Sequence, residues 1–382
     1  MRTRPVRPRG FTLVELLVAV ALGMLITVAV SAMLVRQEGA RRSLTSTNDV
    51  LLNGAHVAHL VDRMLRGAGS GFSQAWQSAY GCRLAVARGG TQLLPRGSDW
   101  PAPFAAVSRS PRLAPVLVHS GAGAGGSDVL AVASGNSGLA EAPLRALAGS
   151  ATVNSVRVPA TVGLRANDLI LLAEAGRADC MLQQAATGFA GGATQQIDFG
   201  ADYSAGTIGT LNLADFGGVG DVSVLPMGNG AGNIPQVLLM GIGADRTLVA
   251  LDMLRLAGGA DDPVTPLADG VVELRARYGI DTNNDRIVDQ WVDPAASPWR
   301  AADLMDGSAG AQANLYRILA VRVAVVLRNA TADRAAVTGA SLLLFPDLDA
   351  ALQHTRALDA TEQRFRHRVL EFTVPLRNVM LI

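Results

Sequence analysis

The chain has 382 residues, a formal net charge of +1, and only 4% aromatic residues. A near-neutral chain has no long-range attraction for nucleic acid, so its charge argues against a nucleic-acid partner. The sequence contains no lysine, which excludes a Walker A lysine and a Schiff-base lysine. Abundant glycine with few aromatic residues is typical of a loop-rich β domain rather than of a helical bundle.

An apolar run lies near the start of the chain, behind four arginines. Residues 11–35 contain one ionisable side chain, Glu15. A run of this length can cross a bilayer as a helix. A carboxylate in hydrocarbon costs at least a few kcal/mol and usually has a partner. If the chain is cut between Gly10 and Phe11, the new amino terminus of Phe11 is a cation that Glu15 of a neighbouring subunit can neutralise. The run is therefore predicted to be a membrane span and an assembly helix.

Residues 9–16, Arg-Gly-Phe-Thr-Leu-Val-Glu-Leu, resemble the class III leader and cleavage site of type IV pilins and type II secretion pseudopilins. The resemblance implies cleavage after Gly10 and N-methylation of Phe11 by a prepilin peptidase. A generic signal peptide is the alternative. It would have small residues at a cut beyond the apolar run, whereas Ser31 and Ala32 lie inside it.

The helix is predicted to continue well beyond the apolar run. No proline occurs between Pro8 and Pro95, so nothing interrupts the helix before the glycines near residue 67. Its second half has an apolar face that we expect to pack on a globular domain: Leu51, Ala55, Ala58, Val61 and Leu65. Three glycines have two open interpretations, close packing or local bending of the helix: Gly23, Gly39 and Gly54.

Beyond the helix, short apolar runs separated by turn-forming residues predict β-strands. They cover residues 129–133, 153–158, 169–173, 236–240, 247–254, 271–278, 316–327 and 365–374. The clearest strand surrounds Val321, with alternate apolar residues on one face and Arg322 and Arg328 on the other, as expected for a sheet with one side on a core. Residues 185–233 and 293–312 lack periodicity and are predicted to be long loops or insertions.

Several further segments resemble the minor pilins of the PilW family. They are the helix end with Arg63 and Arg66, Tyr80-Gly81-Cys82, residues 126–130, residues 167–171 leading to Cys180, and residues 368–378. The resemblance implies an α+β, pilin-like fold, in which a long N-terminal helix packs on a mainly antiparallel β-sheet domain with long loops. The expected parts are a leader at 1–10, a transmembrane or filament-core half-helix at 11–35, an amphipathic half at 36–68, and a periplasmic β-rich domain at 69–382.

This resemblance also implies a place in the cell. The expected protein is a single-pass subunit of the inner membrane of a Gram-negative bacterium, with its C-terminal domain in the periplasm, that later enters a pilus. It would prime pilus assembly and join a tip complex with other minor pilins, the major pilin and a tip adhesin. The alternatives are a pseudopilin at the tip of a type II secretion pseudopilus, or a tip adhesin or DNA-binding subunit. No nucleophile elbow or catalytic triad is found, so no enzymatic activity is predicted.

The sequence has two cysteines, Cys82 and Cys180. In an oxidising periplasm an even pair suggests one disulfide. Closing a loop of about 100 residues would stabilise the domain by up to about 4–5 kcal/mol in the chain-entropy model. Two free buried thiols are the alternative.

Residues 281–289 carry a pattern of oxygen-bearing side chains. The residues that match positions 1, 3, 5, 7 and 9 of a calcium-binding loop are Asp281, Asn283, Asp285, Ile287 (through its carbonyl) and Asp289. Arg286 stands at the sixth position, where such a turn prefers glycine, and the twelfth position lacks a glutamate. The two interpretations are a Ca²⁺ site and a hairpin connection rich in turn-forming residues. No other cofactor is predicted.

Three weaker patterns have simple structural interpretations. The basic residues at 364, 366, 367 and 368 could touch DNA phosphates, but the single aromatic Phe365 is too little for a stacking platform, so a charged strand face is favoured. His56 and His59, one helical turn apart, are interpreted as a solvated helix face. The glycine-rich residues 121–126 precede a predicted strand rather than a helix, so they are interpreted as a flexible loop.

Overall fold

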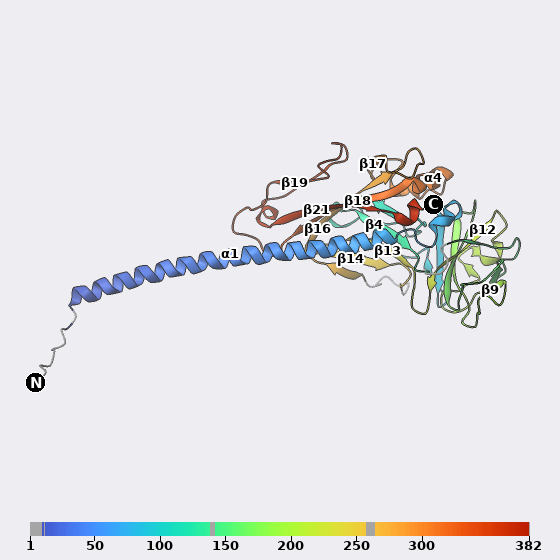
Figure 1. The fold of residues 1–382 in the computed structure, drawn as a ribbon, viewed down its shortest axis with the longest axis horizontal. Coiled ribbons are helices and arrows are strands. Elements are labelled where there is room, and N and C mark those ends of the chain that lie inside the picture. Colours follow the sequence, from blue (N-terminus) through green and yellow to red (C-terminus); the bar gives the residue numbers. More distant parts are fainter. Residues whose placement is uncertain (1–9, 11, 138–141, 257–263, 382) are drawn as a thin grey trace, which may run out of the picture.

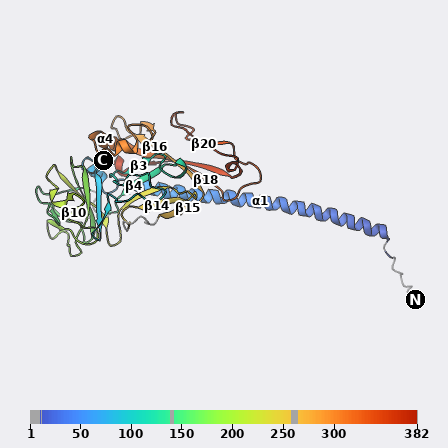
Figure 2. The ribbon, with the colours of Figure 1, turned by 180° about the vertical axis from the view of Figure 1, so that it is seen from behind.

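The computed structural model describes residue 10 and residues 12–137, 142–256 and 264–381. A helix of 55 residues, α1 (Leu13–Gly67), extends from a β-rich body, and its N-terminal part lies outside that body (Figure 1). Figure 2 shows the same arrangement from behind, with the C-terminus in the body and the N-terminus at the far end of the helix. The predicted α+β, pilin-like fold is confirmed, because a long N-terminal helix is followed by mostly antiparallel sheets.

Helix α1 ends where the sequence predicted. Its last residue is Gly67, and Ala68 leaves the helical conformation with φ −56° and ψ 137°. At 1.5 Å per residue the helix is about 80 Å long. The absence of proline and the polar N-cap residue Thr12 account for an uninterrupted helix of this length.

The buried face of α1 differs from the predicted one by about one position. The residues that enter the core are Val50, Val57, Val61, Leu65 and Ala68. Val61 and Leu65 were predicted correctly, but Leu51 and Ala55 are exposed. The reason is Gly54, where strand β21 (His367–Pro375) comes close to the helix axis. A Cβ at Gly54 would lie 2.6 Å from Leu370 Cδ1.

The sheet that packs on α1 has four antiparallel strands in the order β17-β16-β18-β21. The first three strands are β17 (Gln290–Val292), β16 (Val271–Ile280) and β18 (Ile318–Arg328). On β18, the alternate residues from Leu319 to Leu327 are buried in the main core, as predicted. The other face of the sheet, predicted to be polar, also has an apolar part: Ala324 and Val326 are buried against Leu344 and Phe345.

A segment between β18 and β21 covers this outer face. We call residues 329–366 the strap. It contains the hairpin of β19 (Ser341–Leu344) and β20 (His354–Ala357) and the short helix η4 (Glu362–Arg364). The strap was not predicted because the outward positions of β18 combine arginine with small apolar residues. Such a face can be either exposed to solvent or covered by another segment, so the pattern does not distinguish the two.

A five-stranded antiparallel sheet, in the order β15-β14-β13-β4-β3, completes the main core. Its strands are β15 (Thr265–Ala268), β14 (Leu248–Asp252), β13 (Gln236–Ile242), β4 (Val129–Ser134) and β3 (Val116–His119). Short helices surround this core: η1 (Ser73–Ala75), α2 (Trp76–Ala79), η2 (Ala124–Gly126), α3 (Ala301–Leu304), α4 (Ala309–Arg317) and α5 (Arg377–Met380).

A six-stranded sheet forms the end of the body that is farthest from the free part of α1 (Figure 1). Its strands, in spatial order, are β2 (Thr91–Leu94), β1 (Arg83–Arg88), β8 (Asp179–Gln184), β7 (Asp168–Glu174), β12 (Val222–Asn229) and β5 (Leu144–Arg145). One face of this sheet contributes to the main core and the other covers a second apolar cluster. Around that cluster lie β6 (Ser155–Arg157), β9 (Gln196–Asp198), β10 (Thr207–Ile208), β11 (Leu211–Asn212) and η3 (Leu213–Asp215).

All eight predicted strands are present with shifted ends, but the two predicted loops are not simple loops. Residues 185–233 contain β12, an interior strand of the six-stranded sheet. Its pattern was hidden because Pro226 interrupts the run, and the structure accommodates the proline at a register shift between Pro226 and Gly228. Residues 293–312 contain α3 and the start of α4, which also includes Tyr316.

Candidate assembly interface

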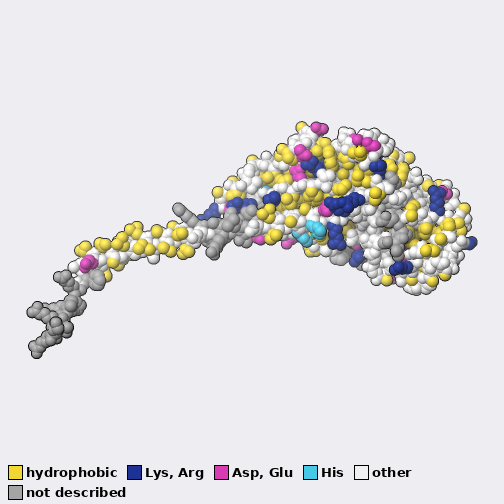
Figure 3. Space-filling model, in the orientation of Figure 1, with side chains coloured by type: hydrophobic (Ala, Val, Ile, Leu, Met, Phe, Trp, Pro, Cys, Tyr) yellow, Lys and Arg dark blue, Asp and Glu magenta, His cyan; other side chains and the backbone are white. Residues whose placement is uncertain are grey.

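The N-terminal half of α1 exposes a continuous apolar surface. Residues Leu13–Leu34 form the one described helical segment that is long and apolar enough to cross a membrane, by length and composition, and none of it is buried in the body. Its large apolar side chains expose between 48% and 76% of their area. Figure 3 shows this surface along the free part of the helix, broken by one acidic group near its start. An apolar surface of this extent needs a membrane or a protein partner.

Glu15 closes a hydrogen-bonded cap at the start of α1. Its Oε2 accepts the backbone N–H of Thr12 at 3.0 Å and the Thr12 hydroxyl at 2.9 Å, and the Glu15 N–H donates to Thr12 Oγ1 at 3.3 Å. This reciprocal pair is a capping box. Phe11 and the leader up to Arg9 lie outside the described residues, so the predicted pairing of Glu15 with a neighbour's Phe11 stays a prediction, as does processing at Gly10.

The last part of α1 is held in the body at two points. Gly54 admits Leu370 of β21, as described above. At the C-terminus of the helix, the Asn378 side-chain amide lies 3.1–3.3 Å from the carbonyl oxygens of Arg66, Gly67 and Ala68 and donates to them. These carbonyls have no partner within the helix, so Asn378 supplies a C-terminal cap. The end of the chain therefore anchors the end of the helix.

The predicted disulfide between Cys82 and Cys180 is present. It joins residues 98 positions apart, with a Cα–Cα distance of 5.6 Å. Cys82 directly precedes β1 and Cys180 lies in β8, which runs parallel to β1, and the adjacent Arg83 and Asp179 form a two-pronged ion pair whose second contact is 2.9 Å. The disulfide thus joins two neighbouring strands of the six-stranded sheet at the ends where they begin.

The predicted calcium loop is folded tightly on its own carboxylates. Asp281 is fully buried, and its two oxygens accept the backbone N–H groups of Asn283, Asn284 and Arg286 at 3.1, 2.6 and 2.8 Å. The Asp289 carboxylate accepts the N–H and hydroxyl of Thr282, and these hydrogen bonds hold its pKa below the ordinary value. Within the described residues, no cluster of three or more His, Cys, Asp or Glu side chains could hold a metal ion. Calcium binding through these oxygens stays a prediction.

Arg286 has a role that the sequence did not reveal. It adopts φ +65°, the conformation that glycine would take at this position of a calcium loop. Its guanidinium lies 4.3 Å from the ring centroid of Tyr316 and donates to the carbonyl oxygens of Tyr316 and Val379. The only signal in the sequence was that arginine replaces the glycine expected at the sixth position of a calcium loop. That replacement argued against calcium binding, but it did not predict the contact between Arg286 and Tyr316.

The three weaker patterns are explained by the fold. His56 and His59 are exposed, and the nearby Asp62 carboxylate pairs with Arg66 at 2.6 Å. The glycine-rich loop leads into β4 as predicted, and its Gly121 N–H donates to the buried Asp128 carboxylate.

In the basic segment, the side chains of Arg364 and Arg366 both bind Asp333, at its carbonyl and its carboxylate respectively. These two arginines therefore hold the strap and are not displayed together for a phosphate backbone.

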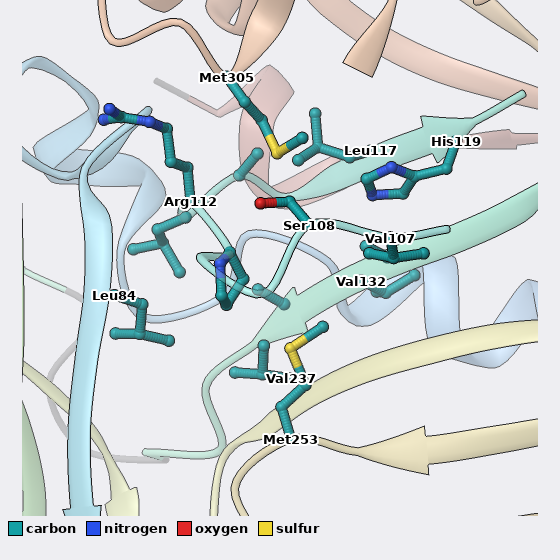
Figure 4. A pocket seen from close by; sticks show the side chains of 15 residues that line it. Leu84, Val107, Ser108, Arg112, Leu117, His119, Val132, Val237, Met253 and Met305 are labelled. Carbon is teal, nitrogen blue, oxygen red and sulfur yellow. The ribbon is translucent and has the colours of Figure 1, made fainter. Parts of the chain in front are cut away.

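A small cavity lies between β3, β4 and the preceding loop (Figure 4). It is lined mainly by apolar side chains and by His119, and holds about 20 Å³, room for about one water molecule. The Arg112 guanidinium points away from the imidazole (Figure 4). Burial lowers the pKa of His119 to about 4. The cavity is too small for an organic ligand, and it matters for stability rather than for binding.

An exposed apolar half-helix, capped at its start and anchored at its end on a mostly antiparallel body, is a pilin-like arrangement and is consistent with a membrane anchor. The comparisons with known proteins agree with this class. Residues 7–31 match the prokaryotic N-terminal methylation motif, and residues 239–378 match the family described as type IV pilus-assembly protein W. The C-terminal part of the chain is therefore similar to the PilW family, and its N-terminal part carries the prepilin methylation motif. No curated protein and no solved structure matches the chain.

The two matches cover the two features on which an assembly role depends. The methylation motif covers most of the exposed half of α1, and the PilW match runs from β13 to α5, including the sheet and the Asn378 cap that hold the other half. The two matches imply pilins and a prepilin peptidase as partners in general terms.

Proposed function

We propose that this protein is a minor pilin that primes assembly of a type IV pilus and takes its place in the tip complex. Prepilin peptidase cleaves after Gly10 and methylates Phe11, which leaves a transmembrane half-helix at 11–35, an amphipathic half at 36–68 and a periplasmic domain at 69–382. The protein is inserted once in the inner membrane of a Gram-negative cell. It then moves into the pilus with other minor pilins, the major pilin and a tip adhesin.

The observation that carries this proposal is the division of α1. Its N-terminal half buries none of its apolar surface in the chain's own body, whereas its C-terminal half is fixed by Gly54 and Asn378. A membrane anchor alone does not need Glu15 inside the apolar run, since a carboxylate there is costly. A helix that leaves the bilayer to pack against other helices has a use for both features. The family match favours a pilus over a secretion pseudopilus.

Two measurements test the proposal. Mass spectrometry of the mature protein should find methylated Phe11 at the N-terminus; a retained leader contradicts processing. Deletion of the gene should reduce the number of pili per cell, and re-expression should restore it. Unchanged piliation after deletion contradicts the priming role even if processing is confirmed.

A further inference from the structure

A group of cationic side chains lies at one end of the four-stranded sheet. Arg328 is the last residue of β18 and is paired in register with His367, the first residue of β21. Arg356, on β20 of the strap, is close enough to lower the pKa of both Arg328 and His367. Arg246, in the turn before β14, is close enough to lower the pKa of Arg328, an effect second only to burial. We call Arg328, Arg356 and His367 the cationic cluster.

The cationic cluster has hydrogen-bonding groups without partners. The Nε of Arg356 and the Nε2 of His367 are buried and make no hydrogen bond. The other two nitrogens of Arg356 bind Glu273 at 3.3 Å and Glu362 at 2.8 Å. A buried polar atom without a partner costs about 1–3 kcal/mol, so a ligand that satisfied these atoms would stabilise the protein.

Arg328 is the centre of the cationic cluster. The carbon of its guanidinium lies 3.7 Å from the ring centroid of Phe365, and among the described residues its N–H groups make no hydrogen bond. Among the described residues, no carboxylate forms an ion pair with Arg328 or Arg246. The charged groups that act on Arg328 are Arg246 and Arg356, which repel it, and Glu362, which is already bound to Arg356. The positive charge therefore exceeds the negative charge at this point.

His367 makes the cationic cluster sensitive to protonation. Its Nδ1 lies 3.1 Å from the carbonyl oxygen of Phe365 and donates to it, so Nε2 carries a hydrogen only when the ring is protonated. Burial and the nearby charges of Arg328 and Arg356 lower the pKa of His367, although the Phe365 carbonyl and Glu362 oppose this. An anion bound between these groups would favour the protonated ring.

The position of the cationic cluster along α1 limits its possible partners. Strand β21 runs parallel to α1, because Leu370 packs at Gly54 and Asn378 packs at the helix end. His367 therefore lies at the end of the sheet nearest the membrane, roughly 20 Å beyond Leu34 by helical and strand rises. Headgroups extend only about 5–8 Å from the hydrocarbon. A phospholipid headgroup is out of reach of a straight helix.

We propose that Arg328, Arg356 and His367 form a binding site for an oxyanion, and that the oxyanion is a carboxylate of a neighbouring subunit in the assembled state. Two N–H edges of Arg328 offer the geometry that a carboxylate accepts. The partner part of the proposal rests on the pilin function proposed above, whereas the binding site itself does not.

The full-length protein in detergent provides a direct test. Thermal unfolding is followed by tryptophan fluorescence in sodium sulfate and in sodium chloride at equal ionic strength. At pH 6 we expect a saturable rise in Tm of about 2–4 °C in sulfate, and a smaller rise at pH 8. Arg328→Gln should lose most of the rise, and His367→Gln should lose its pH dependence. Arg334→Gln is the matched control, because Arg334 is exposed on the same strap. Equal responses of R328Q and R334Q, or no difference between the salts, would overturn the site.

Two further arms identify the source of the oxyanion. The protein is reconstituted in phosphatidylcholine vesicles with or without phosphatidylglycerol. A sulfate response that persists in both supports a protein carboxylate, and a response that disappears with phosphatidylglycerol overturns it in favour of a lipid. In cells, Arg328→Glu should reduce pilus assembly and Arg334→Glu should not; equal effects overturn the partner assignment. Processing of the leader, measured on the same samples, reports on the pilin function separately.

Discussion

The guanidinium of Arg286 lies over the ring of Tyr316, and the same Tyr316 ring stacks on Trp76 at a centroid distance of 4.2 Å. This contact connects three distant parts of the chain: the loop after β16, helix α4 and the segment that follows α1. It also explains why an arginine adopts a backbone conformation that is usually left to glycine. Arg286 therefore fixes the loop after β16 to helix α4.

Arg286→Gly is expected to destabilise the body by about 1–2 kcal/mol, because the lost cation–π contact and hydrogen bonds outweigh the relief of the positive φ. Urea unfolding of the full-length protein measures the change. The matched control is Arg334→Gly, because Arg334 is exposed. Arg317→Gly would not serve, because Arg317 lies in a helix that glycine itself would destabilise. An unchanged unfolding free energy for R286G would show that the anchor is dispensable.

The calcium prediction for the same loop has its own test. If the oxygens of Asp281, Asn283, Asp285, Ile287 and Asp289 bind Ca²⁺, calcium should raise the Tm of the full-length protein and magnesium should not. The Asp285→Ala variant should remove the response. Identical melting in calcium and in chelator would leave the hairpin connection as the whole explanation.

Gly54 is expected to tolerate alanine but not leucine. Alanine meets only the end of the Leu370 side chain, which can move, and gains up to about 1 kcal/mol of helix propensity. Leucine would overpack the contact and cost about 1–3 kcal/mol. Asn53→Leu, at the adjacent exposed position, is the matched control in thermal unfolding. A G54L protein as stable as N53L would mean that helix and strand are not tightly packed there.

The disulfide is expected to contribute about 4–5 kcal/mol to stability, from the entropy lost by an unfolded chain closed over 98 positions. The Cys82→Ser, Cys180→Ser double variant should unfold at a lower urea concentration by a corresponding amount. A reducing agent should destabilise the wild-type protein and leave the double variant unchanged. Insensitivity of the wild type to reduction would count against a stabilising disulfide.

Acid is expected to destabilise the body through His119. The folded protein keeps this imidazole neutral, with a pKa of about 4, whereas the unfolded chain takes up a proton near pH 6.5. The unfolded state therefore binds more protons between these values, and the unfolding free energy falls as pH falls from about 6.5 to about 4, by about 3 kcal/mol in total. His119→Leu should remove this part of the pH dependence, and the exposed His56→Leu should not. Parallel curves for the wild type and H119L would contradict the assignment.

Replacing Glu15 separates its two possible roles. Glu15→Ala should spare membrane insertion and leader cleavage but reduce co-assembly with other pilins, measured by cross-linking. Glu15→Gln keeps an acceptor for the Thr12 N–H but removes the charge. If E15Q assembles normally, the cap is sufficient and the pairing with Phe11 is unnecessary. If E15Q fails like E15A, the charge itself is required.

The sequence allowed most of the architecture to be predicted, because long periodic patterns follow from local physics. Helix α1 and the strand around Val321 each repeat a regular apolar spacing, and their ends were found within a few residues. The face of α1 was misplaced because Gly54 has no side chain to reveal that another strand comes close. Strand β12 was missed because Pro226 interrupts its apolar run, and proline is unusual in an interior strand.

The candidate functional residues also divide into those that a local pattern indicates and those that only the fold reveals. Gly10, Phe11 and Glu15 could be proposed because their spacing relative to an apolar run is itself the signal, and their roles stay predictions. The two cysteines left a single pairing, which is present. Asn378, Arg286 and Arg328 act through contacts with residues tens to hundreds of positions away. Their local sequence does not show which residues they contact, and only the folded arrangement does.

The anchoring of α1 at Gly54 and Asn378 has a mechanical consequence. A rod clamped between Gly54 and its C-terminal end transmits displacement without bending at the clamp, so any pull on the body is delivered directly to the free part of the helix. In the pilin function proposed above, the body would serve as a handle by which partner subunits withdraw the helix from the bilayer. Loosening the clamp at Gly54 would let the body move while the helix stayed behind, and force applied by the assembling complex would be dissipated within the subunit.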